Sequence, residues 1–261
     1  HGGATAVASG NPVGGNGRLL RLGPAEMAAF ERFGGNAGLP QPGCGTFAEL
    51  VPLLANDDDR RLGGKSRRPF LHVASFTHPH DPYVTRQEYW NRYEGVDIPL
   101  PEVSAADVDA DPHTLRLRAA CDMERTPIGN DDVRRARRAY LGNISYVDDW
   151  TGRLLQTLES LGLADDTVVI LLADHGDMLG ERGLWYKMNF FEGSARIPLI
   201  VHAPGRFRAR RVATPVSLVD VLPTLIELSG GAVTDAVEPL AGQSLLPLCA
   251  GKAEDRTVVG E

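Results

Sequence analysis

The stretch TVVILLADHGDMLGERGLWYKMNFFEGSARIP, from Thr167 to Pro198, decides the fold of this chain. It begins with a short apolar run, residues 167–172, whose β-branched side chains are typical of a strand covered on both faces in a parallel sheet. Asp174 and His175 follow that run after a single alanine. Because open α/β sheets bind ligands beyond the carboxyl ends of their strands, we expect these two side chains at a ligand site.

Asp174 and His175 are candidate ligands of a divalent metal. Asp offers a hard carboxylate oxygen and His offers a nitrogen, and adjacent residues can reach one cation if the turn splays them. The alternative is an ordinary turn that Asp174 caps and in which His175 is a loop residue, because Asp and Gly are common in turns. The tripeptide DHG alone favours that alternative, so the longer stretch has to decide.

The longer stretch contains DHGDMLGERGLWYK followed by MNFFEGSARIPL, and it resembles the sulfatases of the alkaline phosphatase superfamily, the choline sulfatases most of all. The resemblance implies that Asp174 and His175 bind the active-site metal and that Lys187 binds sulfate and takes part in catalysis. In the loop before Lys187, Gly180 and Gly183 give turning freedom, and the apolar pair at 184–185 is expected to anchor the ammonium.

The same resemblance implies the fold class. We expect an α/β fold of the alkaline phosphatase type, a sandwich in which helices cover both faces of a mostly parallel sheet. The longest predicted helix, residues 131–161, has apolar positions at steps of three and four and should complete a right-handed βαβ unit. A further strand is predicted at 197–204 and a helix at 218–228, capped by Ser217. Residues 84–130 are interpreted as a loop at the pocket mouth.

A second polar segment, THPHDPY, follows another predicted buried strand, PFLHVASF, at residues 69–76. Proline disfavours helical geometry in the residue before it, so the two histidines are expected in a loop. Sulfatases carry a similar Pro-His-x-Pro segment whose histidine contacts the sulfate. By this resemblance His80 is a catalytic and substrate-binding residue, and His78 is a weaker candidate for substrate binding. From the residues alone, an ordinary loop histidine is an equally good interpretation of His80.

Four side chains are expected to converge at one end of the sheet: His80, Asp174, His175 and Lys187. Each follows a predicted strand at its carboxyl end or lies in the loop beyond it.

The chain is interpreted as two segments. Residues 1–66 are rich in Gly, Pro, Asn and Ala and are interpreted as an irregular insertion, with helices expected at 24–33 and 46–54. Residues 67–261 are interpreted as the central and later part of a sulfatase α/β domain that is incomplete at both ends.

The composition excludes several classes of protein. A formal net charge of −7 argues against a nucleic-acid partner, which would require a basic surface. No apolar run approaches the ~20 residues that cross a bilayer, so no membrane partner is expected. Three widely spaced cysteines with no CxxC pair predict neither a disulfide framework nor a thiolate zinc site. We therefore expect a reducing, cytoplasmic compartment.

The sulfatase nucleophile is missing from this sequence. In the family it comes from C-x-[PA]-x-R, whose Cys or Ser is converted to formylglycine. The three cysteines lie in other contexts, CGTFA, CDMER and CAGKA, and Cys121 is interpreted as a non-catalytic apolar residue. The sequence is thus interpreted as the middle of a longer sulfatase, inactive alone, whose amino-terminal part would supply formylglycine.

The activity implied for the full-length enzyme is hydrolysis of a small-molecule sulfate ester, choline sulfate first, by a homo-oligomer. Calcium is the favoured metal because a carboxylate-rich oxygen set suits a hard cation, and the nitrogen ligand leaves manganese or magnesium open. Two alternatives remain. One is a phosphonate or phosphate ester hydrolase of the same superfamily, and the other is a non-catalytic fragment.

Overall fold

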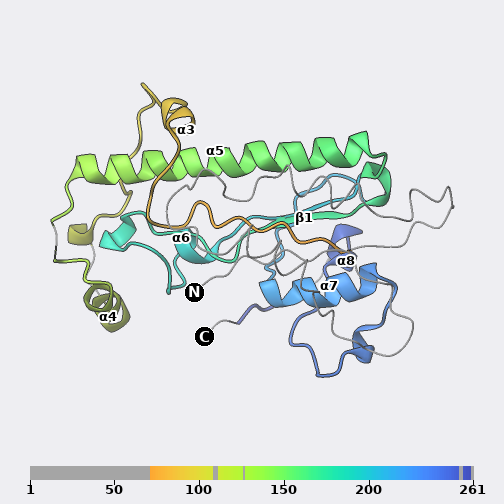
Figure 1. Cartoon of the computed structure of the whole chain (residues 1–261). Helices are drawn as coiled ribbons and strands as arrows, with labels where there is room; N and C mark the ends of the chain where they lie inside the picture. The colour runs from red at the N-terminus through yellow and green to blue at the C-terminus, as the bar shows by residue number, and fades with distance from the viewer. Residues whose placement is uncertain (1–70, 108–110, 126, 253–254, 260–261) are drawn as a thin grey trace, which may run out of the picture. The chain divides into compact units, whose positions relative to one another are not determined.

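The computed structural model describes residues 71–261, except for 108–110, 126, 253–254 and 260–261 (Figure 1). The insertion predicted at 1–66, with its two helices, lies outside the described residues. The chain divides into two compact units. Within the described part, the first unit holds residues 71–161 and 177–188, and the second holds residues 162–176 and 189–259.

The long helix α5, Asn130–Ser160, confirms the helix predicted at 131–161 to within one residue at each end. Its first turn is stabilised by charge, because Asp131 and Asp132 lie at the positive end of the helix dipole. Asp132 also accepts a hydrogen bond from the backbone N–H of Gly129 at 3.0 Å, which satisfies a donor that the helix itself cannot.

The short helix α3, Gln87–Asn91, packs against α5 in the first unit (Figure 1). Tyr89 is 5% exposed, and its ring stands edge-on to Tyr146 of α5 with centroids 5.4 Å apart. Arg138 of α5 donates to the carbonyl of Trp90 and lays its guanidinium over the indole, 4.2 Å from the centroid. Aromatic and cation–π contacts therefore fix this pair of helices.

The interpretation of residues 84–130 as a loop is wrong over α3 and α4, Pro112–Ala120. The carboxylate of Asp111 caps α4 by accepting from the backbone N–H groups of His113 and Thr114 at 2.8 and 3.1 Å. Pro112 occupies the first helical position, where its missing N–H costs nothing. The Asp-Pro pair was the sequence signal for this helix, and the absence of a clear apolar period hid it.

The second unit contains the two strands of the described sheet, β1 (Val169–Leu172) and β2 (Leu199–His202). Both were predicted, although each is shorter than its apolar run. They pair antiparallel, with Val169 opposite His202 and Leu172 opposite Leu199. The mostly parallel sheet expected from the sequence is therefore not represented by this pair.

The buried strand predicted at 69–76 is wrong over residues 71–76, which form no strand. Leu71 and Val73 are 51% and 38% exposed. A strand exists only through hydrogen bonds to a neighbour, and in the part of the chain that the structure describes the one pair of strands is β1 with β2. For the same reason the described residues do not form the βαβ unit predicted around α5.

The predicted helix at 218–228 is confirmed, but its first turn is a 3₁₀-helix, η6 (Leu218–Asp220), that continues into α7 (Val221–Leu228). Asp220 is 6% exposed, and its carboxylate accepts from the backbone N–H groups of Ser217 and Gln243 at 2.9 and 2.8 Å. The cap predicted at Ser217 is therefore reinforced by a buried aspartate.

The remaining elements of the described residues are short. They are η3 (Ala105–Asp107), η4 (Ala164–Asp166), η5 (Glu181–Gly183), α6 (Glu192–Ala195), η7 (Val233–Asp235) and α8 (Leu246–Cys249). Among the described residues, no helix combines the length and the apolar character that crossing a membrane requires.

Two glycines of α5 should respond oppositely to alanine. A Cβ on Gly142 would lie 2.9 Å from the Thr85 hydroxyl, whereas a Cβ on Gly152 would meet nothing within 4 Å. We expect Gly152→Ala to raise the free energy of unfolding by about 0.5–1 kcal/mol through helix propensity. Gly142→Ala should lower it by about 1–3 kcal/mol through overpacking. Urea denaturation of both variants measures this, and equal shifts would contradict the packing of Thr85 on α5.

Candidate functional site

His80 and Lys187 meet in the first unit, although they lie 107 residues apart in the sequence. The Nζ of Lys187 is 2.5 Å from the Nε2 of His80. An ammonium only donates, so Nε2 accepts. The other ring nitrogen, Nδ1, lies 2.8 Å from the backbone oxygen of Asp81 and 3.0 Å from its carboxylate, both of which only accept. The contacts thus assign the ring proton to Nδ1 and direct Nε2 at the ammonium.

Lys187 is carried by a tightly turned loop, residues 177–188. Gly180 and Gly183 have φ values of 91° and 67°, which a residue with a side chain rarely adopts. A Cβ on Gly183 would also lie 2.5 Å from the Cβ of Ala105. Met178 and Leu184 are 2% and 0% exposed and anchor the loop in the core. The turning freedom and the apolar anchor predicted for this loop are confirmed, with Leu184 as the buried member.

A part-buried carboxylate, Asp177, organises the start of this loop. The hydroxyl of Tyr83 donates to its two oxygens at 3.0 and 2.9 Å. The backbone N–H groups of Leu179 and Tyr186 donate to Oδ1 at 2.9 and 3.2 Å. Burial raises the pKa of Asp177, and burial together with the neighbouring carboxylate raises the pKa of Tyr83. The phenol therefore stays protonated and acts as a donor.

An ion pair ties the same loop to α5. Arg137 donates to the Glu181 carboxylate at 2.8 Å and to the carbonyl of Leu179 at 2.9 Å. Glu181 also accepts from the backbone N–H groups of Glu102 and Val103 at 3.1 and 3.2 Å. Burial alone would raise the pKa of Glu181, but the bonds from Arg137 and from the two amides hold it below its usual range.

His78 lies in a different environment from His80. Its ring centroid is 5.0 Å from that of Tyr146 on α5, and burial lowers its pKa. The weaker of the two candidate histidines therefore packs against Tyr146, which also contacts Tyr89.

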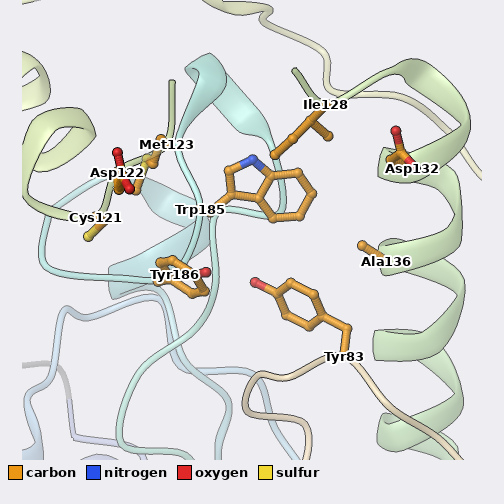
Figure 2. Close-up of a pocket in the computed structure, with 9 residues that line it drawn as sticks. All are labelled: Tyr83, Cys121, Asp122, Met123, Ile128, Asp132, Ala136, Trp185 and Tyr186. Atoms are coloured by element: carbon orange, nitrogen blue, oxygen red, sulfur yellow. The ribbon is translucent and has the colours of Figure 1, made fainter. Parts of the chain in front are cut away.

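A pocket of about 280 Å³ opens in the first unit (Figure 2). Its lining residues are Tyr83, Cys121, Asp122, Met123, Ile128, Asp132, Ala136, Trp185 and Tyr186. Figure 2 shows the indole of Trp185 and the ring of Tyr186 on one segment, the ring of Tyr83 reaching toward them from another, and Asp132 and Ala136 on a helix at the side. Cys121 is not in a disulfide and lines this pocket.

Asp174 and His175 lie just beyond the carboxyl end of β1, in the second unit. The backbone N–H of His175 donates to Asp174 Oδ1 at 2.9 Å. The ring nitrogen Nε2 of His175 lies 3.6 Å from the other carboxylate oxygen, Asp174 Oδ2. The next residue, Gly176, must be a glycine, because a Cβ there would lie 2.1 Å from the carbonyl oxygen of Gly193. Its N–H donates to the carbonyl of Ser194 at 2.7 Å.

The donor chemistry of Asp174 and His175 fits part of a metal site. The Nδ1 of His175 lies 2.8 Å from the carbonyl oxygen of Gly176, so Nδ1 carries the proton and Nε2 is the acceptor beside the Asp174 carboxylate. Metal-binding histidines are commonly oriented by such a bond. Among the described residues there is no group of three or more His, Cys, Asp or Glu side chains that could hold a metal, so these two supply part of a ligand set.

The four predicted site residues thus form two pairs. The structure brings His80 to Lys187 in one unit and places Asp174 beside His175 in the other. The convergence of both pairs at one site stays a prediction.

The family of the chain follows from comparison with known proteins. The sulfatase family model matches residues 54–231, and the chain belongs to the sulfatase family. It is 45% identical to the choline-sulfatase of Rhizobium meliloti (strain 1021) over 220 residues, which are 82% of this chain and 43% of that protein.

Solved structures confirm the predicted α/β fold class. The phosphonate monoester hydrolase SpPMH from Silicibacter pomeroyi aligns with a TM-score of 0.65 and 27% identity, over 79% of this chain and 42% of that one. A putative sulfatase, yidJ from Bacteroides fragilis, aligns with a TM-score of 0.62 and 25% identity, over 79% and 41%. The chain therefore spans about two fifths of the length of these relatives.

The Glu181 carboxylate should make the stability of the chain depend on pH. Because its pKa is lower in the folded chain than in the unfolded one, its contribution is complete above about pH 5 and is lost as the pH falls through the folded value. Glu181→Gln should lower the free energy of unfolding by about 1–3 kcal/mol at pH 7, because it weakens the hydrogen bonds from Arg137 and from two backbone amides.

Denaturant titrations of wild type and variant across pH 3–7 measure this difference. We expect the free energies of unfolding of wild type and Glu181→Gln to become similar at the acid end of this range. Glu227→Gln, at an exposed position of α7, is the control and should change stability by less than about 0.5 kcal/mol. A deficit of Glu181→Gln that stays constant with pH would contradict the role of the charge.

Proposed function

We propose that the whole protein hydrolyses a sulfate monoester, with choline sulfate as the first candidate substrate. The observation that carries the proposal is the contact between Lys187 and His80, which joins a fixed positive charge to a proton-transfer group within 2.5 Å. The 45% identity to a choline-sulfatase supports the choice of substrate. The proposal includes a small-molecule ester as partner, a homo-oligomer and a cytoplasmic location.

Lys187 acts on the sulfate group in this mechanism. Its ammonium binds a sulfate oxygen and stabilises the negative charge that moves onto the group as the ester bond breaks. The buried residues of the loop hold the ammonium in place before the substrate arrives, so little reorganisation is needed in the reaction.

His80 holds a sulfate oxygen or transfers the proton. Asp81 binds Nδ1, so Nε2 is the ring nitrogen that exchanges a proton at the substrate. Alkoxides of simple alcohols are poor leaving groups, and a histidine that protonates the departing oxygen lowers that barrier. Nε2 must be protonated for this step, and the ammonium of Lys187 then turns from the ring to the substrate oxygen.

Asp174 and His175 would hold the divalent cation. When bound, the cation supplies charge stabilisation at a sulfate oxygen and activation of the nucleophile, for which the family uses formylglycine. We favour calcium because of the carboxylate ligand, with manganese or magnesium as alternatives because of the imidazole.

A phosphonate or phosphate ester hydrolase is the second candidate function. It is supported by the structural likeness to the phosphonate monoester hydrolase from Silicibacter pomeroyi.

Turnover of choline sulfate and of an aryl phosphonate monoester by the whole protein distinguishes the candidates. We expect kcat/KM to be at least about tenfold higher for the sulfate, since one or two well-placed polar contacts give such discrimination. A higher value for the phosphonate would reverse the assignment. Turnover of neither ester, in protein that carries formylglycine and metal, would indicate a non-catalytic protein.

Lys187→Ala should lower kcat/KM of the whole protein by about two to three orders of magnitude, the usual effect of removing one preorganised charge-stabilising group. Lys187→Arg should restore only part of the loss, because a planar fork does not occupy the place of a compact ammonium. Lys252→Ala, at an exposed position, is the matched control and should keep the wild-type rate. Wild-type rates for Lys187→Ala, with an unchanged melting temperature, would remove Lys187 from the site.

A further inference from the structure

Asp177 lies between the two segments that carry the proposed sulfate-binding residues. On one side it accepts from the hydroxyl of Tyr83, three residues beyond His80, at 2.9 and 3.0 Å. On the other side it accepts from the backbone N–H of Tyr186, the neighbour of Lys187, at 3.2 Å. One carboxylate therefore links the two segments next to both functional side chains.

The ring of Tyr83 is itself held in a fixed position. Its centroid lies 5.8 Å from that of Trp185 and 6.3 Å, edge-on, from that of Tyr140 on α5. Figure 2 shows Tyr83 reaching from its own segment toward Trp185 and Tyr186. Packing therefore fixes the orientation of the ring before its hydroxyl binds Asp177. The hydrogen bond then holds Asp177, and the loop that carries it, at a fixed distance from the segment of Tyr83.

The hydrogen bond is strong enough to matter for geometry. Asp177 is part-buried, and a carboxylate withdrawn from water is destabilised more by the loss of a donor than an exposed one is. The backbone N–H of Met178 donates to the carbonyl of Tyr186 at 2.8 Å, so the two ends of the loop are already joined. Tyr83 donates to Asp177 from outside the loop.

We propose that Tyr83 and Asp177 are positioning residues whose hydrogen bond sets the separation of His80 and Lys187. Neither side chain need touch the substrate. The consequence for the reaction rests on the function proposed above, whereas the effect on the His80–Lys187 contact is independent of it. Displacing a charge-stabilising group by about 1 Å can cost on the order of a hundredfold in rate, so small drift of either segment is sufficient.

Tyr83→Phe tests the proposal, with Tyr93→Phe as the matched control. Both variants remove one part-buried tyrosine hydroxyl and keep the ring, and the hydroxyl of Tyr93 lies 2.8 Å from Ser145 Oγ. The first readout is the ¹⁵N signal of His80 Nε2 in the 261-residue chain. We expect Tyr83→Phe to shift this signal toward its position in Lys187→Ala, and Tyr93→Phe to leave it unchanged.

A double-variant cycle separates positioning from general stability. In the wild-type background, Lys187→Ala should shift the ¹⁵N signal of His80. In the Tyr83→Phe background, the shift caused by Lys187→Ala should be less than half as large. A full-sized shift in both backgrounds would overturn the proposal. If Tyr83→Phe does not fold, Asp177→Asn serves instead, because it keeps the shape and removes the charge.

The kinetic readout uses the whole protein and choline sulfate. Tyr83→Phe should lower kcat/KM about 10- to 100-fold, and Tyr93→Phe less than about twofold, at similar melting temperatures. In the Lys187→Ala background, Tyr83→Phe should have less than about a twofold further effect, because the group that it positions is gone. Equal losses in both backgrounds would overturn the positioning role. Absence of turnover in wild type would instead contradict the proposed function. The shift of the His80 signal would then still test whether Tyr83 and Asp177 set the separation of His80 and Lys187.

Discussion

A carboxylate that leaves water must be given hydrogen-bond donors, and Asp177 receives them from its own loop and from Tyr83. The rest of the first unit depends on this requirement. The loop bends back on itself with Leu184 fully buried, and Arg137 fixes its far side to α5. Lys187 therefore leaves a rigid support, and its ammonium meets the Nε2 of His80.

The parts of the fold that the sequence predicts well are local. Helix α5 has a long apolar period and acidic first turn, and the run before Asp174 is apolar and β-branched, so both could be found without knowing any contact. Helix α4 is harder to find, because its sequence has little apolar periodicity and the Asp-Pro pair at its start is the one signal. Residues 71–76 have the composition of a strand, but strand formation depends on a partner that composition does not show.

For the candidate site, residue types could be predicted and their connections could not. The motif around Asp174 and the Pro-His segment identify chemistry-bearing side chains, and the structure shows which of the two histidines meets Lys187. Tyr83 and Asp177 carry no signal of their own, because a tyrosine after Asp-Pro and an Asp after Gly are both common in turns. Their relation arises only when segments 94 residues apart come together.

The 107-residue separation of His80 and Lys187 has a consequence for the order of folding. Helix α5 is built from contacts four residues apart, whereas the pair of side chains closes a loop that includes the whole helix, and long loops form after local structure. The contact therefore depends on the helix and not the reverse. On mild denaturation the His80–Lys187 contact should be lost while most of the helical signal in circular dichroism persists, so partly opened molecules would keep their secondary structure without this contact.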